Sequence, residues 1–400
     1  MKSNTKPRLF FLLVLLLVTS PLCRGQQDVP EKYKSLYEQY KSGLEKYNAY
    51  LDRADRKSKS TVCFGAELLA ANGNRGEDLL SPRALKGVEL SLDRFVELGI
   101  QGATIAIGYP ILTDDLPRSD EYLAFYKKVA EMVRSRHMKL CVKLHVLFAG
   151  TVYSSLKVDF SLLTVEKLTA GKRLMAERVI GELAPDYLTL GGEPDTEAKL
   201  SGLKALNDPV AYSGMVQSIL KDLKRGNTLV GVGQGTWITP DFAKAYAKTD
   251  VDFINIHIYP FGKRVLEVLN QICATAREGK KRLILDECWL YKVAPGEGLG
   301  VAASAAIYRR DAYGFWEPVD KLFLESMAKV ANQNNIEYVS PFWSHCFFAS
   351  LKYDPTDDQL SYKELNGRFV QAVSAAMQAG TFSGLGRLYS DIIKRYGTTH

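Results

Sequence analysis

The sequence predicts a (β/α)8 TIM barrel preceded by an N-terminal helical extension, and two observations support this prediction. Between residues 61 and 378, short apolar runs alternate with amphipathic helical segments, as in a parallel sheet joined by crossover helices. There are eight such units, and their runs are nearly all apolar, which is typical of strands covered on both faces. An open doubly wound sheet is disfavoured, because no G-x-G-x-x-G or Walker sequence follows the first run.

The elements follow from hydrophobic periodicity. The predicted strands cover residues 61–67, 102–109, 139–146, 187–193, 228–234, 252–259, 281–287 and 336–343. The predicted helices lie near residues 81–98, 119–137, 164–182, 207–225, 240–248, 263–278, 318–334 and 362–378. Residues 29–58 form a further polar helix, whose Tyr and Leu residues recur at helical spacing, and we expect this stripe to pack against the barrel.

The chain divides into a leader at 1–25, an N-terminal helix at 26–60 and a catalytic barrel at 61–400. In the leader, basic residues precede an apolar run at 10–18 that is too short to span a bilayer, which is the pattern of a secretory signal peptide. We therefore expect a secreted or periplasmic protein with no membrane attachment after cleavage. A lipid anchor at Cys23 is disfavoured, because Leu22 is larger than such sites usually accept.

Charge and cysteine usage exclude some classes of protein. Loss of the four basic leader residues lowers the formal net charge from +7 to +3, so nucleic acid is not an expected partner. We expect a monomer without a cofactor or a metal.

Five cysteines remain after the leader, and an odd number argues against a full disulfide framework. A single bridge between Cys288 and Cys346 is the pairing to test.

Barrel enzymes carry their chemistry at the carboxyl ends of the strands. In this sequence a ring of polar and aromatic residues follows the apolar strand bodies, and it predicts a carbohydrate-binding mouth. The predicted substrate-binding residues are Glu67, Tyr109, His145, Gln234, Trp237, His257, Tyr259, Trp289, Trp343 and His345. The long segment 291–317 is expected to be a loop over this mouth, with its aromatic residues available for sugar subsites.

Two glutamates are the predicted catalytic residues. Glu193 and Glu287 end the apolar strands four and seven, where an unpaired acid is costly to bury unless it is used. Across a closed barrel these acids face each other, and a separation of about 5–5.5 Å suits double displacement at a sugar. Tyr259, on the neighbouring strand, is expected to donate a hydrogen bond to Glu287. Asp195 and Asp286 are interpreted as supporting residues.

These motifs resemble those of the clan A glycoside hydrolases, the 4/7 superfamily of (β/α)8 barrels, with some likeness to endo-β-1,4-galactanases. The resemblance rests on Glu193-Pro194, His257-x-Tyr259, Glu287 and Trp343, in order and on the matching strands. It implies a β-linked substrate, retention of configuration, no metal in the mechanism and a cis peptide bond after Trp343. Glu193 would then be the acid/base and Glu287 the nucleophile.

Two departures from the clan pattern keep other functions open. Gly192 stands where the clan usually has an Asn that contacts the sugar 2-hydroxyl, and strand two lacks the usual Arg. A carbohydrate-binding barrel that has lost activity is therefore an alternative. A metal-dependent barrel hydrolase, built from the histidines and the two glutamates, is a second alternative.

Overall fold

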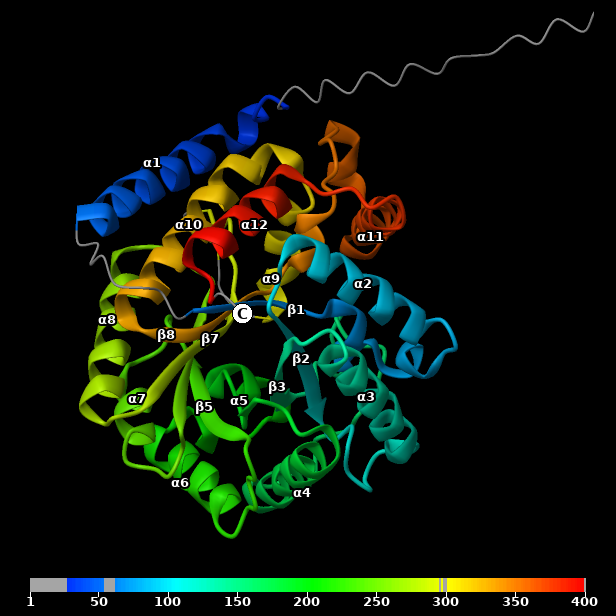
Figure 1. Cartoon of the computed structure of the whole chain (residues 1–400), viewed down its shortest axis with the longest axis vertical. Coiled ribbons are helices and arrows are strands. Elements are labelled where there is room, and N and C mark those ends of the chain that lie inside the picture. Colours follow the sequence, from blue (N-terminus) through cyan, green and yellow to red (C-terminus); the bar gives the residue numbers. More distant parts are fainter. Residues whose placement is uncertain (1–26, 54–61, 295, 298–300, 399–400) are drawn as a thin grey trace, which may run out of the picture.

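The computed structural model describes residues 27–53, 62–294, 296–297 and 301–398. At its centre, eight parallel strands form a closed barrel in sequence order, in which β8 pairs with β1. The helices surround this barrel (Figure 1). The predicted (β/α)8 barrel with an N-terminal helix is therefore confirmed. The predicted signal peptide, including Cys23, lies outside the described residues.

The strands are β1 Cys63–Glu67, β2 Gly102–Tyr109, β3 Lys139–Val146, β4 Tyr187–Thr189, β5 Leu229–Gly235, β6 Phe253–Ile258, β7 Arg282–Cys288 and β8 Ile336–Pro341. The helices are α1 Glu31–Arg53, α2 Ala84–Leu98, α3 Ser119–Arg134, α4 Val165–Leu183, α5 Pro194–Ser201, α6 Pro209–Leu220, α7 Asp241–Tyr246, α8 Lys263–Glu278, α9 Val301–Asp311, α10 Glu317–Asn334, α11 Tyr362–Gln378 and α12 Gly384–Tyr396.

All eight strands lie where the sequence predicts them, but β4 is shorter than expected. It ends at Thr189, so Glu193 lies beyond the strand and precedes α5. Three helices were not predicted: α5, α9 and α12. The presence of α9 also corrects the interpretation of segment 291–317 as a loop. Its alanine-rich sequence has the high helix propensity that explains this outcome.

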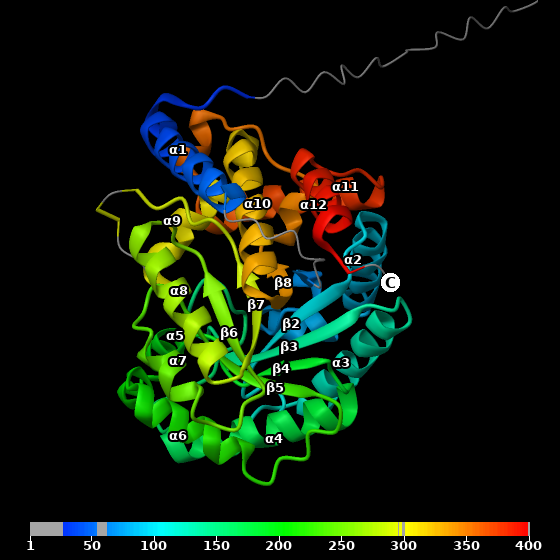
Figure 2. The same ribbon diagram turned by 60° about the vertical axis from the view of Figure 1, so that its left-hand side comes forward.

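The expected packing of the N-terminal helix is confirmed. Its apolar stripe is buried, with Leu36, Tyr37 and Leu44 among the covered side chains. The helix lies along α10 (Figure 2). Burying each such side chain contributes roughly 1.5–3 kcal/mol, which is enough to hold a polar helix on the barrel.

Within the described residues, neither the Cys288–Cys346 bridge that the sequence left to be tested nor the cis peptide bond implied by the clan resemblance is present. All five cysteines after the leader are free: the thiol of Cys288 faces the Ser340 carbonyl at 3.9 Å, and that of Cys346 faces the Asp311 carbonyl at 3.6 Å. Within the described residues the cis peptide bond is Tyr109–Pro110, not the bond after Trp343. Across the same residues, no helix combines the length and the apolar character that crossing a membrane requires.

Candidate active site

The carboxyl ends of β6 and β7 direct acidic and basic side chains into the barrel. Asn255 and His257 are two residues apart on β6, so both point inward. On β7 the pairing with β8 is irregular between Leu285 and Cys288. Such an irregularity breaks the alternation of side chains. As a result the consecutive residues Asp286 and Glu287 both place their carboxylates inside.

Glu287 accepts hydrogen bonds from two donors and remains partly accessible to solvent. The ammonium group of Lys143 and the hydroxyl of Tyr259 each bond one of its carboxylate oxygens, and the side chain is 15% exposed. The predicted bond from Tyr259 is thus confirmed. Burial raises the pKa of Glu287, but the positive charges of Lys143 and His257, together with these bonds, outweigh burial and hold it at about 2. Glu287 is therefore ionised at neutral pH.

Lys143 is a site residue that the sequence analysis does not include, as are Thr196 and Asn255. It lies inside the barrel on β3 and also forms an ion pair with Glu67, at 3.0 Å between Nζ and Oε2. Burial raises the pKa of Glu67 to about 7, even beside this lysine. A charged residue in an apolar strand, two positions before His145, was the available signal. Glu67 itself is fully buried, so it supports Lys143 and does not line the mouth as predicted.

Glu193 enters the site from the start of α5. Gly191 and Gly192 lie in the short connection between β4 and α5. Pro194 takes the first helical position, where its missing N–H costs no hydrogen bond. Thr196 donates to one carboxylate oxygen of Glu193 at 2.6 Å, and Nδ1 of His257 lies 2.9 Å from the other. Burial raises the pKa of Glu193 above its ordinary value, although the contact with His257 lowers it.

His257 lies between two carboxylates, that of Glu193, which follows β4, and that of Asp286 on β7. Its Nε2 lies 2.9 Å from Oδ1 of Asp286, and the amide of Asn255 donates to the same oxygen at 2.7 Å. Burial lowers the pKa of His257, but the charge of Glu287 and the bonds to Asp286 and Glu193 raise it to about 10. The imidazole is therefore a cation at neutral pH, with a carboxylate on each nitrogen.

The two predicted catalytic glutamates come together as expected. Ligand atoms of Glu193, His257 and Glu287 all lie within 4.8 Å of one another, so the carboxylates face each other across a space about one sugar ring wide. This triad has the composition of a metal site, but both nitrogens of His257 already bond carboxylates, and Lys143 already neutralises Glu287. Its donor set is therefore a poor match for a divalent cation.

Three predicted substrate-binding residues point away from the mouth. Tyr109 stacks on Phe160, with 6.3 Å between ring centroids, because its position on β2 faces outward. Gln234 is fully buried and accepts from the backbone N–H of Ala243 at 2.6 Å, so it holds the start of α7. Trp289 is buried, and its indole N–H donates to a carboxylate oxygen of Asp311 at 3.2 Å.

Four further predicted residues are half-buried. The ring centroids of Trp237 and Tyr259 lie 6.1 Å apart, and those of Trp343 and Tyr308 lie 5.3 Å apart. His145 lies in the barrel two residues after Lys143, and burial lowers its pKa to about 3. His345 packs against Phe369 on α11 and is turned away from the glutamates. As predicted, Asp195 has a supporting role, since it accepts from the Trp237 indole at 2.9 Å.

No protein-family model and no curated protein sequence matches the chain. Among solved structures it is similar to a GH5_18 protein from Bifidobacterium longum subsp. longum, with 16% sequence identity, a TM-score of 0.51, and coverage of 85% of this chain and 80% of that one. A variant of that protein in complex with Manβ1-4GlcNAc matches with 15% identity, a TM-score of 0.50, and coverage of 84% and 78%. An endo-β-1,4-glucanase from Xanthomonas axonopodis pv. citri matches with 14% identity, a TM-score of 0.50, and coverage of 85% and 100%.

Identities this low establish the fold alone. The resemblance to (β/α)8 glycoside hydrolases that the sequence motifs suggested therefore holds at the level of the barrel. What the barrel does has to be argued from its side chains.

Proposed function

We propose that this protein is a retaining glycoside hydrolase that acts on a β-linked glycan, with Glu193 as acid/base and Glu287 as nucleophile. The observation that carries the proposal is that a carboxylate oxygen of Glu193 lies within 4.8 Å of a carboxylate oxygen of Glu287. Retaining enzymes separate their carboxyls by about 5–5.5 Å, whereas inverting enzymes leave about 6.5–9.5 Å to admit a water molecule. The named activities of the structural neighbours agree with this reaction class.

The environments of the two acids suit different roles. Lys143 and Tyr259 keep Glu287 ionised, so one of its oxygens can attack the anomeric carbon. Burial keeps the pKa of Glu193 raised, so that it can hold a proton and pass it to the departing glycosidic oxygen. In the second step Glu193 takes a proton from water, the resulting hydroxide attacks the same carbon, and the bond to Glu287 breaks.

Lys143 supplies the positive charge that the clan pattern places on strand two. It reaches the nucleophile from β3, which accounts for the absence of an arginine at the end of β2. Trp343 and Trp237 border the mouth and offer flat apolar faces for the C–H face of a sugar. We further propose that the protein is exported, on the basis of the leader sequence.

The two alternatives make different predictions. A carbohydrate-binding barrel without activity would have no need for a nucleophile kept ionised by two donors. A metal-dependent hydrolase would lose activity on dialysis against EDTA, whereas the mechanism proposed above is unaffected by EDTA. The Glu287→Gln variant should abolish turnover and leave sugar affinity nearly unchanged.

The decisive experiment is trapping of the covalent intermediate. The purified protein is incubated with activated 2-deoxy-2-fluoro-β-glycosides of glucose, mannose and galactose, and the peptide that gains mass is sequenced. We expect label on Glu287, and none in the Glu287→Gln variant. Label on a different residue would contradict the assignment. Failure of the wild-type protein to hydrolyse any 4-nitrophenyl β-glycoside would contradict the proposed activity.

A further inference from the structure

An aromatic wall borders the site on the side of Glu287. We define it as Tyr291, Tyr308, Tyr153, Tyr362 and Trp343. These residues come from five separate places in the chain, and each ring contacts at least one other wall residue. The wall lies one residue away from Glu287, because the ring centroid of Tyr291 is 4.3 Å from that of Tyr259, which bonds Glu287.

The wall has no gap that a glycan chain could pass through. Successive ring centroids are 5.2 Å apart for Tyr291 and Tyr308, 5.3 Å for Tyr308 and Trp343, and 5.6 Å for each pair that Tyr153 forms, with Tyr308 and with Tyr362. A sugar between two rings needs two van der Waals contacts of about 3.5–4 Å each. The hydroxyls of Tyr291 and Tyr308 are also hydrogen-bonded to each other.

Buried charges fix the segment that carries Tyr291. The neighbouring Lys292 is fully buried and pairs with Asp311 at the end of α9 and with Asp320 on α10, the latter at 2.7 Å. Next in the chain, the backbone of Val293 both donates to and accepts from the hydroxyl of Tyr40 on α1, at 3.1 and 3.0 Å. The N-terminal helix thus holds the base of the wall.

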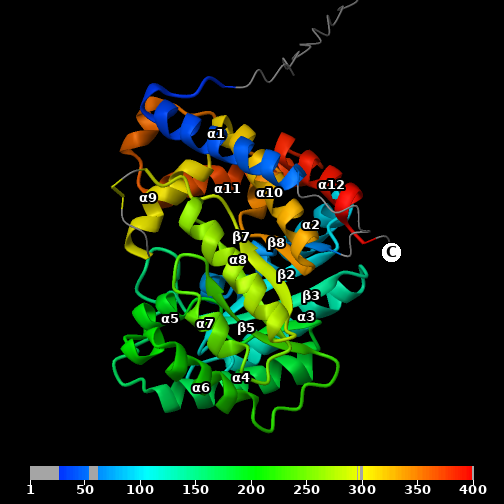
Figure 3. The same cartoon turned by 90° about the vertical axis from the view of Figure 1, so that its left-hand side faces the viewer.

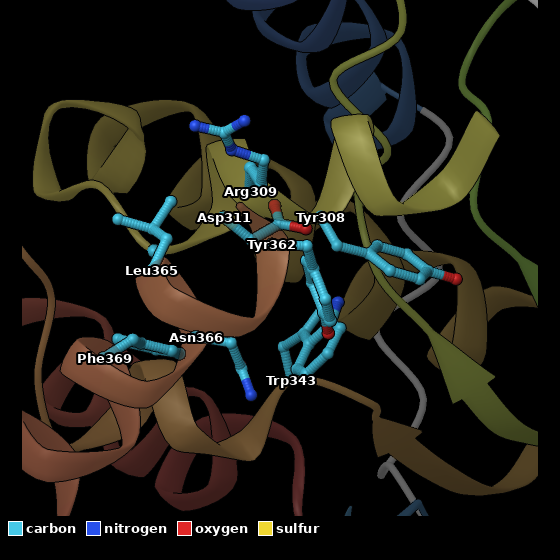
Figure 4. A pocket seen from close by; sticks show the side chains of 9 residues that line it. Tyr308, Arg309, Asp311, Trp343, Tyr362, Leu365, Asn366 and Phe369 are labelled. Atoms are coloured by element: carbon cyan, nitrogen blue, oxygen red, sulfur yellow. The ribbon is translucent and has the colours of Figure 1, made fainter. Parts of the chain in front are cut away.

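A second set of contacts fixes α9, which carries Tyr308. Its Arg309 donates to the carbonyl of Asp357 at 2.7 Å, in the short helix before α11. Figure 3 shows α9 at the same end of the barrel as α5, which follows Glu193 in the chain. In Figure 4, Tyr308, Tyr362 and Trp343 line one recess where α9 and α11 meet. The wall is therefore part of the packed structure.

The position of the wall determines which end of a substrate it meets. In double displacement the acid/base protonates the departing group, so that group leaves past Glu193. Four of the wall residues follow β7, which carries Glu287, or the neighbouring β8, whereas Glu193 follows β4 in the closed barrel. We therefore place the sugar that becomes attached to Glu287 against Trp343 and the wall. Any further residue on the non-reducing side of that sugar would meet the aromatic rings.

We infer that the protein removes single sugars from the non-reducing ends of β-linked chains, with the aromatic wall as the steric stop. This inference rests on the proposed function and specifies its mode of cleavage. Tyr308 and Tyr362 are its specificity-determining residues. They act by excluding a second glycon residue and make no contact with the reacting atoms.

The test is product analysis with defined oligosaccharides. Cellotetraose, β-1,4-mannotetraose and β-1,4-galactotetraose, each reduced with borodeuteride to mark the reducing end, are digested with the full-length protein. Products are followed by mass spectrometry from the earliest times. We expect unlabelled monosaccharide to appear first, together with a labelled product one sugar shorter. Early release of unlabelled disaccharide or trisaccharide would overturn the inference and leave the proposed hydrolase activity intact. No cleavage of any tetrasaccharide or 4-nitrophenyl glycoside would overturn both.

Variants then test the wall itself. Opening it with Tyr308→Ala or Tyr362→Ala should raise the fraction of disaccharide among the first products about tenfold or more, the size of a steric discrimination of one to two kcal/mol. Tyr308→Phe keeps the ring and should keep the wild-type pattern. Tyr50→Ala is the matched control, since Tyr50 is 62% exposed on α1 and does not belong to the wall. If both alanine variants give wild-type products, the wall is not the stop and the inference is overturned.

Discussion

The imidazole of His257 occupies the space that a side chain at Gly192 would need. A Cβ on Gly192 would lie 2.5 Å from Cε1 and 2.7 Å from Nε2 of that ring. The ring cannot easily move, because it bonds Glu193 on one side and Asp286 on the other. The absence of a side chain at Gly192 therefore leaves the space in which the ring of His257 lies.

Gly192→Ala should therefore damage the site. We expect its extra methyl group to push His257 off Glu193, to lower kcat/KM by about tenfold or more, and to cost about 1–3 kcal/mol of stability through overpacking. Steady-state kinetics and thermal melting measure the two effects. The control is Gly181→Ala in α4, where a Cβ would meet nothing within 4 Å. Wild-type kinetics in Gly192→Ala would show that His257 is free to move.

Lys143→Met should move the acid limb of the pH–rate profile. The folded-state pKa of Glu287 is lowered to about 2, so the nucleophile stays ionised, and activity persists, until the pH falls through that value. Without the lysine charge the pKa of Glu287 rises, and kcat/KM near pH 5 should fall on the order of 10–100-fold. Lys139→Met, at an exposed position on the same strand, is the control. An unmoved acid limb would mean that Lys143 does not set the charge of Glu287.

Most of the fold was readable from the sequence because buried parallel strands are apolar on both faces. The strand around Ile254 and Ile256 is an example, since every residue of β6 is buried. The unpredicted helices are the short α5, α9 within the predicted loop 291–317, and α12 beyond the last predicted element. Pro194 at the first position of α5 and Gly202 after its end were usable signals, but the preceding glycines suggested an extended strand end.

The site was predicted less completely, because side-chain direction depends on register. Tyr109 and Gln234 close the apolar runs of their strands, yet both point outward between strand and helix. The inward direction of both Asp286 and Glu287 depends on an irregularity in β7 that periodicity cannot reveal. Lys143 was overlooked because a lysine within a strand suggests an exposed position, whereas here two buried carboxylates compensate its charge.

Glu67→Gln should make the protein more stable at alkaline pH relative to the wild type. The pKa of Glu67 is about 7 in the folded state, against about 4.3 in an unfolded chain. Folding therefore favours its protonated form, and the wild type loses up to about 4 kcal/mol as the pH rises from about 4.3 through 7. Glutamine removes this loss, while Lys143 keeps its bond to Glu287.

Urea unfolding at about pH 5 and pH 8 measures this difference, with Glu45→Gln on the exposed face of α1 as the control. The expected result is a smaller fall in stability between the two pH values for Glu67→Gln than for either the wild type or the control. An equal fall in all three proteins would show that Glu67 titrates alike in the folded and unfolded states.

His257→Gln should shift the base limb of the pH–rate profile to higher pH while lowering the maximal rate. A glutamine amide can still bond Glu193, but it removes the positive charge that lowers the pKa of that acid. Glu193 then keeps its proton to higher pH, so the decline of kcat/KM at alkaline pH begins later. The maximal rate falls because the carboxylates of Glu287 and Asp286 lose the neighbouring positive charge of the His257 imidazole. If the base limb stays in place while only the rate falls, His257 positions Glu193 without tuning its proton affinity.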